Sequence, residues 1–156
     1  MTLFRRFLPL LVVLALLLGA LGCALLGKPS LQSDTVEEAI INEASGLASS
    51  LKTPGLLYTH NDSGGSASVF VLNKRGLMPA RIELKGVNNR DWEDIATGLD
   101  PRDGQPYVFV GEIGDNNAQY PSVFIHRFAE PEILDTLITV VKIDRMEFTY
   151  EDCPRD

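Results

Sequence analysis

The residues of this chain that could do chemistry gather in residues 88–96, which read Asn-Asn-Arg-Asp-Trp-Glu-Asp-Ile-Ala. This run places the carboxylates of Asp91, Glu93 and Asp94 beside the chain's only tryptophan, Trp92. Carboxylates held close together raise one another's pKa or bind a cation, and a carboxylate beside a metal can act as a general base. The run therefore predicts a site for a cation or for acid–base chemistry, but it does not identify a substrate.

Two further acidic loops flank this run, at residues 60–65 and 111–117. Oxygen ligands without cysteine or clustered histidine suit a hard cation, and Ca²⁺ typically accepts six to eight oxygens in irregular geometry. The chain has no contiguous EF-hand spacing, so a cation site has to be assembled from several loops. Asp and Asn are also ordinary turn residues, which leaves a purely structural role open for each candidate. The ligands that we predict for Ca²⁺, with Mg²⁺ as second choice, are Asp62, Glu93, Asp94, Asp115 and Asn116.

Other catalytic patterns are weak. His60 and Ser63 flank Asp62, but three neighbours in one loop do not make a triad, whose members must be oriented in space. The sequence contains no Gly-x-Ser-x-Gly elbow, no P-loop and no dinucleotide-binding fingerprint. We expect His126 to be a surface or edge residue of a strand and Trp92 to be a packing residue.

Residues 1–27 predict an export signal, because Arg5 and Arg6 precede a long apolar run. The run continues for about twenty residues, which is long enough to span a bilayer, so an uncleaved anchor and an ordinary cleaved signal both stay open. The four residues that end at Cys23, Ala-Leu-Gly-Cys, resemble a bacterial lipobox, although Ala20 stands where Leu is usual. We therefore predict a lipoprotein signal peptide over residues 1–22, lipidation of Cys23 and a tether over residues 23–34. The domain that follows would be extracytoplasmic and membrane-associated, in the periplasm or at the cell surface.

The charge balance excludes one class of partner. The chain has a net charge of −7, and removing Arg5 and Arg6 leaves 12 Lys and Arg against 21 Asp and Glu, a net charge of −9. Such a surface repels nucleic acid, whose binding depends on neutralising phosphates. Lipidation of Cys23 would leave Cys153 as a single cysteine, so no disulfide framework is implied. We therefore expect the fold to rest on packing or on a metal.

From residue 35 the chain has short apolar segments separated by Gly, Pro, Asn and Asp, which is typical of β-strands. A repeat runs through it, since Glu43 aligns with Glu93 at a spacing of 50 and Val69 with Val123 at a spacing of 54. The strands that we predict lie at residues 43–48, 56–59, 68–72 and 80–84 and again at residues 93–98, 107–110, 122–126 and 139–150. A four-stranded antiparallel unit repeated at about fifty residues is typical of a β-propeller blade. The predicted fold is all-β, with about two such blades after an apolar signal helix, and a small β-sandwich is the alternative.

The two ends of the repeat suggest more blades. Residues 35–41 lead into Glu43 as residues 80–86 lead into the next unit, so we predict that they form the outer strand of a further blade. Arg155 and Asp156 repeat the Arg-Asp pair that opens the second unit. Because propellers typically have four to eight blades, we expect residues 35–156 to be a partial propeller truncated at its C-terminus. A complete short β-domain with a polar tail is the alternative.

The runs Asn-Asp-Ser-Gly at 61–64, Asn-Arg-Asp-Trp-Glu-Asp-Ile-Ala at 89–96 and Gly-Glu-Ile-Gly-Asp-Asn at 111–116 resemble those of bacterial exported β-propeller proteins of unassigned function. Those proteins are loosely related in architecture to calcium-binding lactonase and gluconolactonase propellers. The resemblance covers residues 41–156 and implies a propeller more firmly than an activity. In a propeller the two kinds of acidic loop emerge on one face. The side chains that would gather there are Glu43, Asn61, Asp62, Asp91, Glu93, Asp94, Glu112, Asp115 and Asn116.

Two functions from different classes follow from this sequence. The first is a membrane-tethered binding module that presents its acidic face to a small-molecule or protein ligand. The alternative is a Ca²⁺-dependent hydrolase of the lactonase or phosphoester type. In that enzyme, Glu93, Asp115 and Asn116 would hold the ion while Asp91 acts as the base. A fold does not by itself imply a function, so the site has to decide between them.

Overall fold

A computed structural model describes residues 35–140 and 142–152 of the chain. The predicted signal peptide, the lipidation site at Cys23, the tether and the final Arg155-Asp156 pair lie outside these residues. No helix among the described residues is long and apolar enough to cross a membrane.

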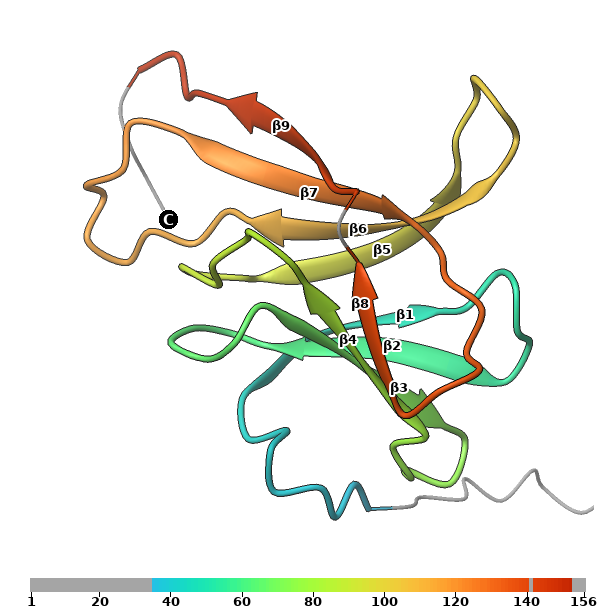
Figure 1. Cartoon of the computed structure of the whole chain (residues 1–156). Coiled ribbons are helices and arrows are strands. Elements are labelled where there is room, and N and C mark those ends of the chain that lie inside the picture. The colour runs from blue at the N-terminus through green and yellow to red at the C-terminus, as the bar shows by residue number, and fades with distance from the viewer. Residues whose placement is uncertain (1–34, 141, 153–156) are drawn as a thin grey trace, which may run out of the picture. The chain divides into compact units, whose positions relative to one another are not determined.

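The described chain is all-β and forms two sheets (Figure 1). The first sheet contains an antiparallel meander of β1 (Ala44–Ser49), β2 (Leu56–Asn61), β3 (Ser68–Asn73) and β4 (Ala80–Leu84). The second sheet contains β5 (Asp94–Leu99), β6 (Pro106–Glu112), β7 (Val123–Ala129) and β9 (Asp144–Phe148), also antiparallel in that order. The all-β prediction is therefore confirmed, and two sheets with mostly antiparallel pairing also suit the β-sandwich alternative.

The hairpins at the start of each sheet close in similar ways. In the β1–β2 turn the amide of Ser50 donates to the carbonyl of Leu56 over 3.0 Å, and in the β5–β6 turn that of Asp100 donates to Gln105 over 2.9 Å. Each turn contains a glycine at positive φ, Gly55 at 95° and Gly104 at 69°, where a side chain would be strained. Gly-containing turns between alternating apolar segments are what the sequence pattern predicted at both places.

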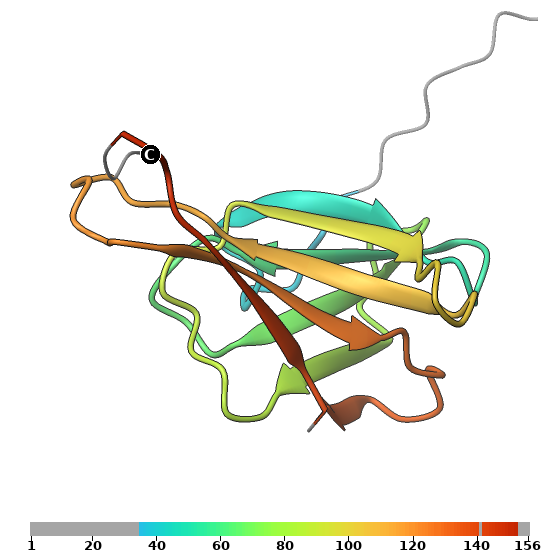
Figure 2. The same cartoon turned by 90° about the horizontal axis from the view of Figure 1, so that it is seen from above.

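The core lies between the inner faces of the two sheets. Strand alternation sends every second side chain inward, and the pairings of Tyr58 with Val71 and of Val110 with His126 put these four residues on inner faces. The strands β1 and β5 lie side by side where the sheets meet (Figures 1 and 2). The largest apolar side chains of the core are Tyr58, Val69, Val71, Ile82, Leu84, Trp92, Ile95, Val108, Val110 and Phe128.

The predicted strand at residues 139–150 is wrong, because the chain forms two strands there. β8 (Leu137–Val140) joins the first sheet parallel to β4, and only β9 completes the second sheet. The physical reason is that β8 satisfies the open edge of β4: Arg81 donates its amide to Thr136, and Lys85 donates its amide to Val140. A parallel partner requires a crossover between the sheets, and the segment after β7 provides it.

The predicted outer strand at residues 35–41 is also wrong, since these residues pair with no described strand and turn at residues 39–40. Local hydrogen bonds replace the ladder. Ile41 donates its amide to Glu38 over 2.9 Å, and the side-chain amide of Asn61 donates to the carbonyl of Ile40 over 2.8 Å. The end of β2 therefore holds this segment in place.

Candidate functional site

The candidate site is built around the side chain of Trp92, which is completely buried in the core. In an extended segment neighbouring side chains point to opposite sides, so burying Trp92 turns Asp91 and Glu93 together away from the core. The amide of Trp92 donates to the carbonyl of Asp62 over 2.8 Å, which places the end of β2 beside this segment. The structure thus confirms that Trp92 is a packing residue, and the packing positions its two acidic neighbours.

The loop after β6 closes the other side of the site. The amide of Glu93 donates to the carbonyl of Gly111 over 2.9 Å, and that of Gly114 donates to the carbonyl of Asp91 over 3.3 Å. Gly114 lies so close to the carboxylates that a Cβ at this position would be 2.5 Å from Oε1 of Glu93 and 2.6 Å from Cγ of Asp91. A side chain at position 114 would therefore displace these two carboxylates.

The three carboxylates of Asp62, Asp91 and Glu93 converge, with one oxygen of each lying within 4.8 Å of the others. Asp91 is only 8% exposed, while Asp62 and Glu93 are partly exposed. Oδ1 of Asp62 is buried and has no hydrogen-bond partner among the described residues. Three hard oxygen ligands from two loops, open to solvent on one side, can hold a divalent cation whose remaining coordination positions are filled by water or by a ligand.

The other predicted ligands lie outside this group. Asp115 is buried, and its two carboxylate oxygens accept the amides of Gln119 at 2.9 Å and Tyr120 at 2.7 Å. Asn116 is exposed on the turn that Asp115 organises, and Asp94 is exposed and accepts the amide of Ile95 at 2.8 Å. Asp94 and Asp115, whose carboxylates bond the backbone, thus have the structural role that was left open for them in the sequence.

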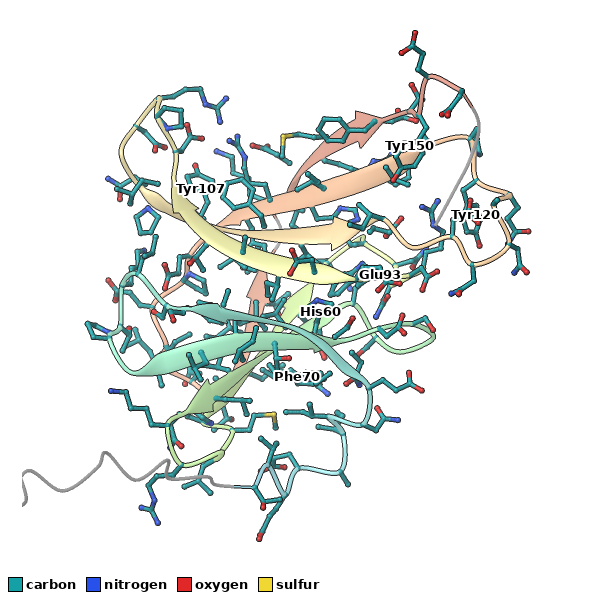
Figure 3. The ribbon with its side chains drawn as sticks, turned by 180° about the vertical axis from the view of Figure 1, so that it is seen from behind. His60, Phe70, Glu93, Tyr107, Tyr120 and Tyr150 are labelled. Carbon is teal, nitrogen blue, oxygen red and sulfur yellow. The ribbon has the colours of Figure 1, made fainter. Side chains whose placement is uncertain are left out.

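His60 connects the site to the core. Figure 3 labels His60 on β2 and Glu93 just before β5. His60 is completely buried against the edge of the Trp92 ring, with ring centroids 5.8 Å apart. Burial lowers the pKa of His60, whereas the carbonyl of Asn61 and the nearby carboxylates of Asp94 and Asp62 act in the opposite direction. The ring is therefore a neutral packing group at neutral pH and adds no positive charge beside the carboxylates.

A buried polar group of His126, Glu112 and Arg90 was not predicted from the sequence. The prediction that His126 is a surface or edge residue is wrong, because its side chain is buried and only 3% exposed. Its Nε2 lies 3.1 Å from the carboxylate of Glu112, and the same carboxylate lies 3.6 Å from Nε of Arg90. The signal was available, since alternation along residues 123–128 places His126 on the same side as the apolar side chains of Phe124 and Phe128.

Comparison with protein-family models, with curated proteins and with solved structures finds no match to this chain. The structure therefore describes the protein on its own terms, as an all-β unit of two sheets that carries a cluster of three carboxylates.

Proposed function

We propose that this protein is an extracytoplasmic, membrane-tethered binding module of the β-propeller class that holds Ca²⁺ and presents it to a small-molecule or protein ligand. The observation that carries the proposal is the convergence of Asp62, Asp91 and Glu93 within 4.8 Å. Three carboxylates at this separation repel one another unless protons or a cation offset their charge. A bound cation would offset this repulsion and so explains why the three carboxylates lie so close together.

The assignment to propeller blades is supported by the repeated meander. β1 and β5 start 50 residues apart, as do β2 and β6, and both meanders continue antiparallel through a third and a fourth strand. In a propeller the innermost strands of successive blades are neighbours, and β1 lies beside β5, with Thr97 donating its hydroxyl to the carbonyl of Ser49 over 2.8 Å. The loops after β2 and before β5 would then share one face with the loop after β6.

A binding role is favoured over hydrolysis by the position of Asp91. The hydrolase hypothesis uses Asp91 as a general base beside an ion held by other residues. Asp91 instead lies within the carboxylate group itself, next to Asp62 and Glu93. A carboxylate that coordinates a cation has a lowered proton affinity and is a poor base. We therefore assign Asp91 to the ligands of the cation.

The test uses Tb³⁺, which replaces Ca²⁺ in oxygen sites and emits when a nearby tryptophan is excited. Trp92 is the only tryptophan and lies between two of the proposed ligands in sequence. We expect the full chain in detergent micelles to sensitise Tb³⁺ emission that Ca²⁺ displaces. Asp91→Asn should weaken Ca²⁺ binding about tenfold or more, because it removes one charged ligand of a hard cation.

Glu132→Gln is the matched control, because Glu132 is exposed on the segment after β7 and lies outside the carboxylate group. It changes the net charge by the same amount and should leave the affinity unchanged. Equal Ca²⁺ affinity of wild type, Asp91→Asn and Glu132→Gln, or no displaceable emission from the wild type, would reject the proposed cation site.

A further inference from the structure

A hollow that is separate from the proposed cation site lies between the β4–β5 connection and the second sheet. None of Asp62, Asp91 and Glu93 lines it. It has a volume of about 610 Å³, which is within the range of small-molecule sites. Its polar lining comes from the β4–β5 connection and from three strands, β6, β7 and β9. The charged and polar residues in the lining are Lys85, Asn88, Arg90, Glu112, His126 and Arg145.

Strand register explains why the second sheet contributes three of these side chains. His126 on β7 is directly opposite Arg145 on β9 and opposite Val110 on β6, so all three share the inner face. Glu112 is two residues beyond Val110 and therefore lies on the same face. The inner face that is apolar at Val110 thus becomes polar toward the end of β6.

The charges in the hollow do not balance. Among the described residues of the lining, Lys85, Arg90 and Arg145 bring three positive charges, and Glu112 brings the one carboxylate. That carboxylate already contacts Arg90 at 3.6 Å and His126 at 3.1 Å. The lining is therefore cationic in a protein whose net charge is −7. A local positive field attracts anions to this hollow although the protein as a whole is acidic.

Aromatic rings hold the two guanidinium groups in position. The guanidinium carbon of Arg90 lies 3.9 Å from the centre of the Tyr120 ring and 5.5 Å from that of Phe124. The guanidinium carbon of Arg145 lies 4.4 Å from the centre of the same Phe124 ring. Figure 3 shows Tyr120 on the loop that leads into β7. Stacking fixes a guanidinium while leaving N–H groups at its edge for an oxyanion, with less side-chain entropy to lose on binding.

We propose that this hollow is a binding site for a small polyanion that carries two or more carboxylate or phosphate groups. Arg90 and Arg145 bind its oxygens through their N–H groups, since planar guanidinium groups match the geometry of carboxylate and phosphate. Lys85 adds a third positive charge at the side formed by the β4–β5 connection. Glu112 orients Arg90 and His126 and does not contact the anion. This inference does not depend on the cation site.

The test is calorimetric titration of the full chain in detergent micelles at about 0.15 M salt, after removal of metal ions with a chelator that is then dialysed away. Pyrophosphate and propane-1,2,3-tricarboxylate are titrated separately, and saturable binding of either one is expected. Binding of pyrophosphate alone identifies a phosphate ligand, and binding of the tricarboxylate alone identifies a carboxylate ligand. Binding of both identifies a site that recognises the oxyanion charge.

Arg145→Gln should weaken the binding about tenfold, because it removes charge-assisted hydrogen bonds to the anion. Lys85→Gln, which changes an exposed side chain, should weaken it in the same direction and serves if Arg145→Gln disturbs the fold. The control is Arg75→Gln, because Arg75 is exposed on the β3–β4 turn and does not line the hollow. No saturable binding of either anion to the wild type, or an equal loss in Arg75→Gln, would overturn the assignment.

Discussion

The hydroxyl of Tyr58, in the middle of β2, donates a hydrogen bond of 2.9 Å to the carboxylate of Glu130, which follows β7 of the other sheet. Glu130 is 1% exposed and also accepts the hydroxyl of Ser50 and the amides of Leu51 and Lys52. Burial raises the pKa of Tyr58 well above its usual value, and the charge of Glu130 raises it further. The tyrosine is thus a neutral donor to a buried carboxylate, which ties the segment after β7 to the β1–β2 turn.

Glu130→Gln should lower the free energy of unfolding by about 2–4 kcal/mol, because a side-chain NH₂ would face groups that all donate and a buried donor would stay unsatisfied. Tyr58→Phe removes one donor of four and should cost only about 1–2 kcal/mol. Urea unfolding at pH 7 measures both. If Glu130→Gln lowers the free energy of unfolding no more than Tyr58→Phe does, the charged carboxylate is not what joins the segment after β7 to the β1–β2 turn.

His60 gives the fold a dependence on pH. Its folded-state pKa is lowered by burial, so below the usual value of 6.5 the unfolded chain binds a proton that the folded chain resists. The unfolded state then binds more protons, and stability falls as the pH drops below about 6.5. We expect the urea midpoint of the wild type to fall between pH 7.5 and pH 5.

His60→Asn removes the titrating ring and should reduce this decrease, whatever the stability of the variant at pH 7.5. The comparison is made on the change in midpoint with pH for each protein. An unchanged decrease in the variant would show that other groups cause it.

Gly46 determines how closely β1 approaches β5. A Cβ on Gly46 would lie 2.9 Å from the amide nitrogen of Ile95 and 3.0 Å from Nε2 of His60. Gly46→Ala should therefore destabilise the protein by about 1–3 kcal/mol, because the backbone of Ile95 has to move. Gly65→Ala is the control, since a Cβ there meets none of the described residues within 4 Å. Thermal unfolding compares them, and equal melting temperatures would mean that the two sheets are not in close contact here.

Local sequence patterns predicted most strands because each strand records its own alternation and each hairpin has its own turn residues. The same patterns could not show which sheet a strand joins. Residues 139–150 were predicted as one strand, but β8 pairs with the edge of β4 and β9 pairs with β7. Glu130 was also not recognisable, since its partners Tyr58 and Ser50 are 72 and 80 positions away.

The acidic group was predictable in part. Asp91 and Glu93 are two positions apart in an extended segment, so their proximity follows from the sequence. The approach of Asp62 depends on a backbone hydrogen bond from Trp92, which no side-chain pattern records. Asp115 has the same residue type and a similar loop position, yet its carboxylate bonds the backbone of its own turn.

Lipidation of Cys23 stays a prediction of the sequence, motivated by the basic start, the apolar run and the Gly-Cys pair. Cys23→Ser should abolish incorporation of a fatty-acid analogue in a bacterial host and move the protein into the soluble fraction, because the acyl chains anchor it. Cys153→Ser is the control and should change neither. Unchanged labelling of Cys23→Ser would contradict lipidation at this cysteine.

Gly114 tests whether the three carboxylates act as one cation site. A Cβ at this position would overlap Oε1 of Glu93 and the carboxyl group of Asp91, so Gly114→Ala must push both carboxylates aside. Their side chains can rotate, so we expect little loss of stability but a decrease in Ca²⁺ affinity of about tenfold, since Ca²⁺ needs its oxygens at about 2.3–2.6 Å. Displacement of Tb³⁺ emission by Ca²⁺ measures this affinity, with Gly65→Ala as the matched control. An affinity equal to that of the wild type would mean that Asp91 and Glu93 do not hold the ion together.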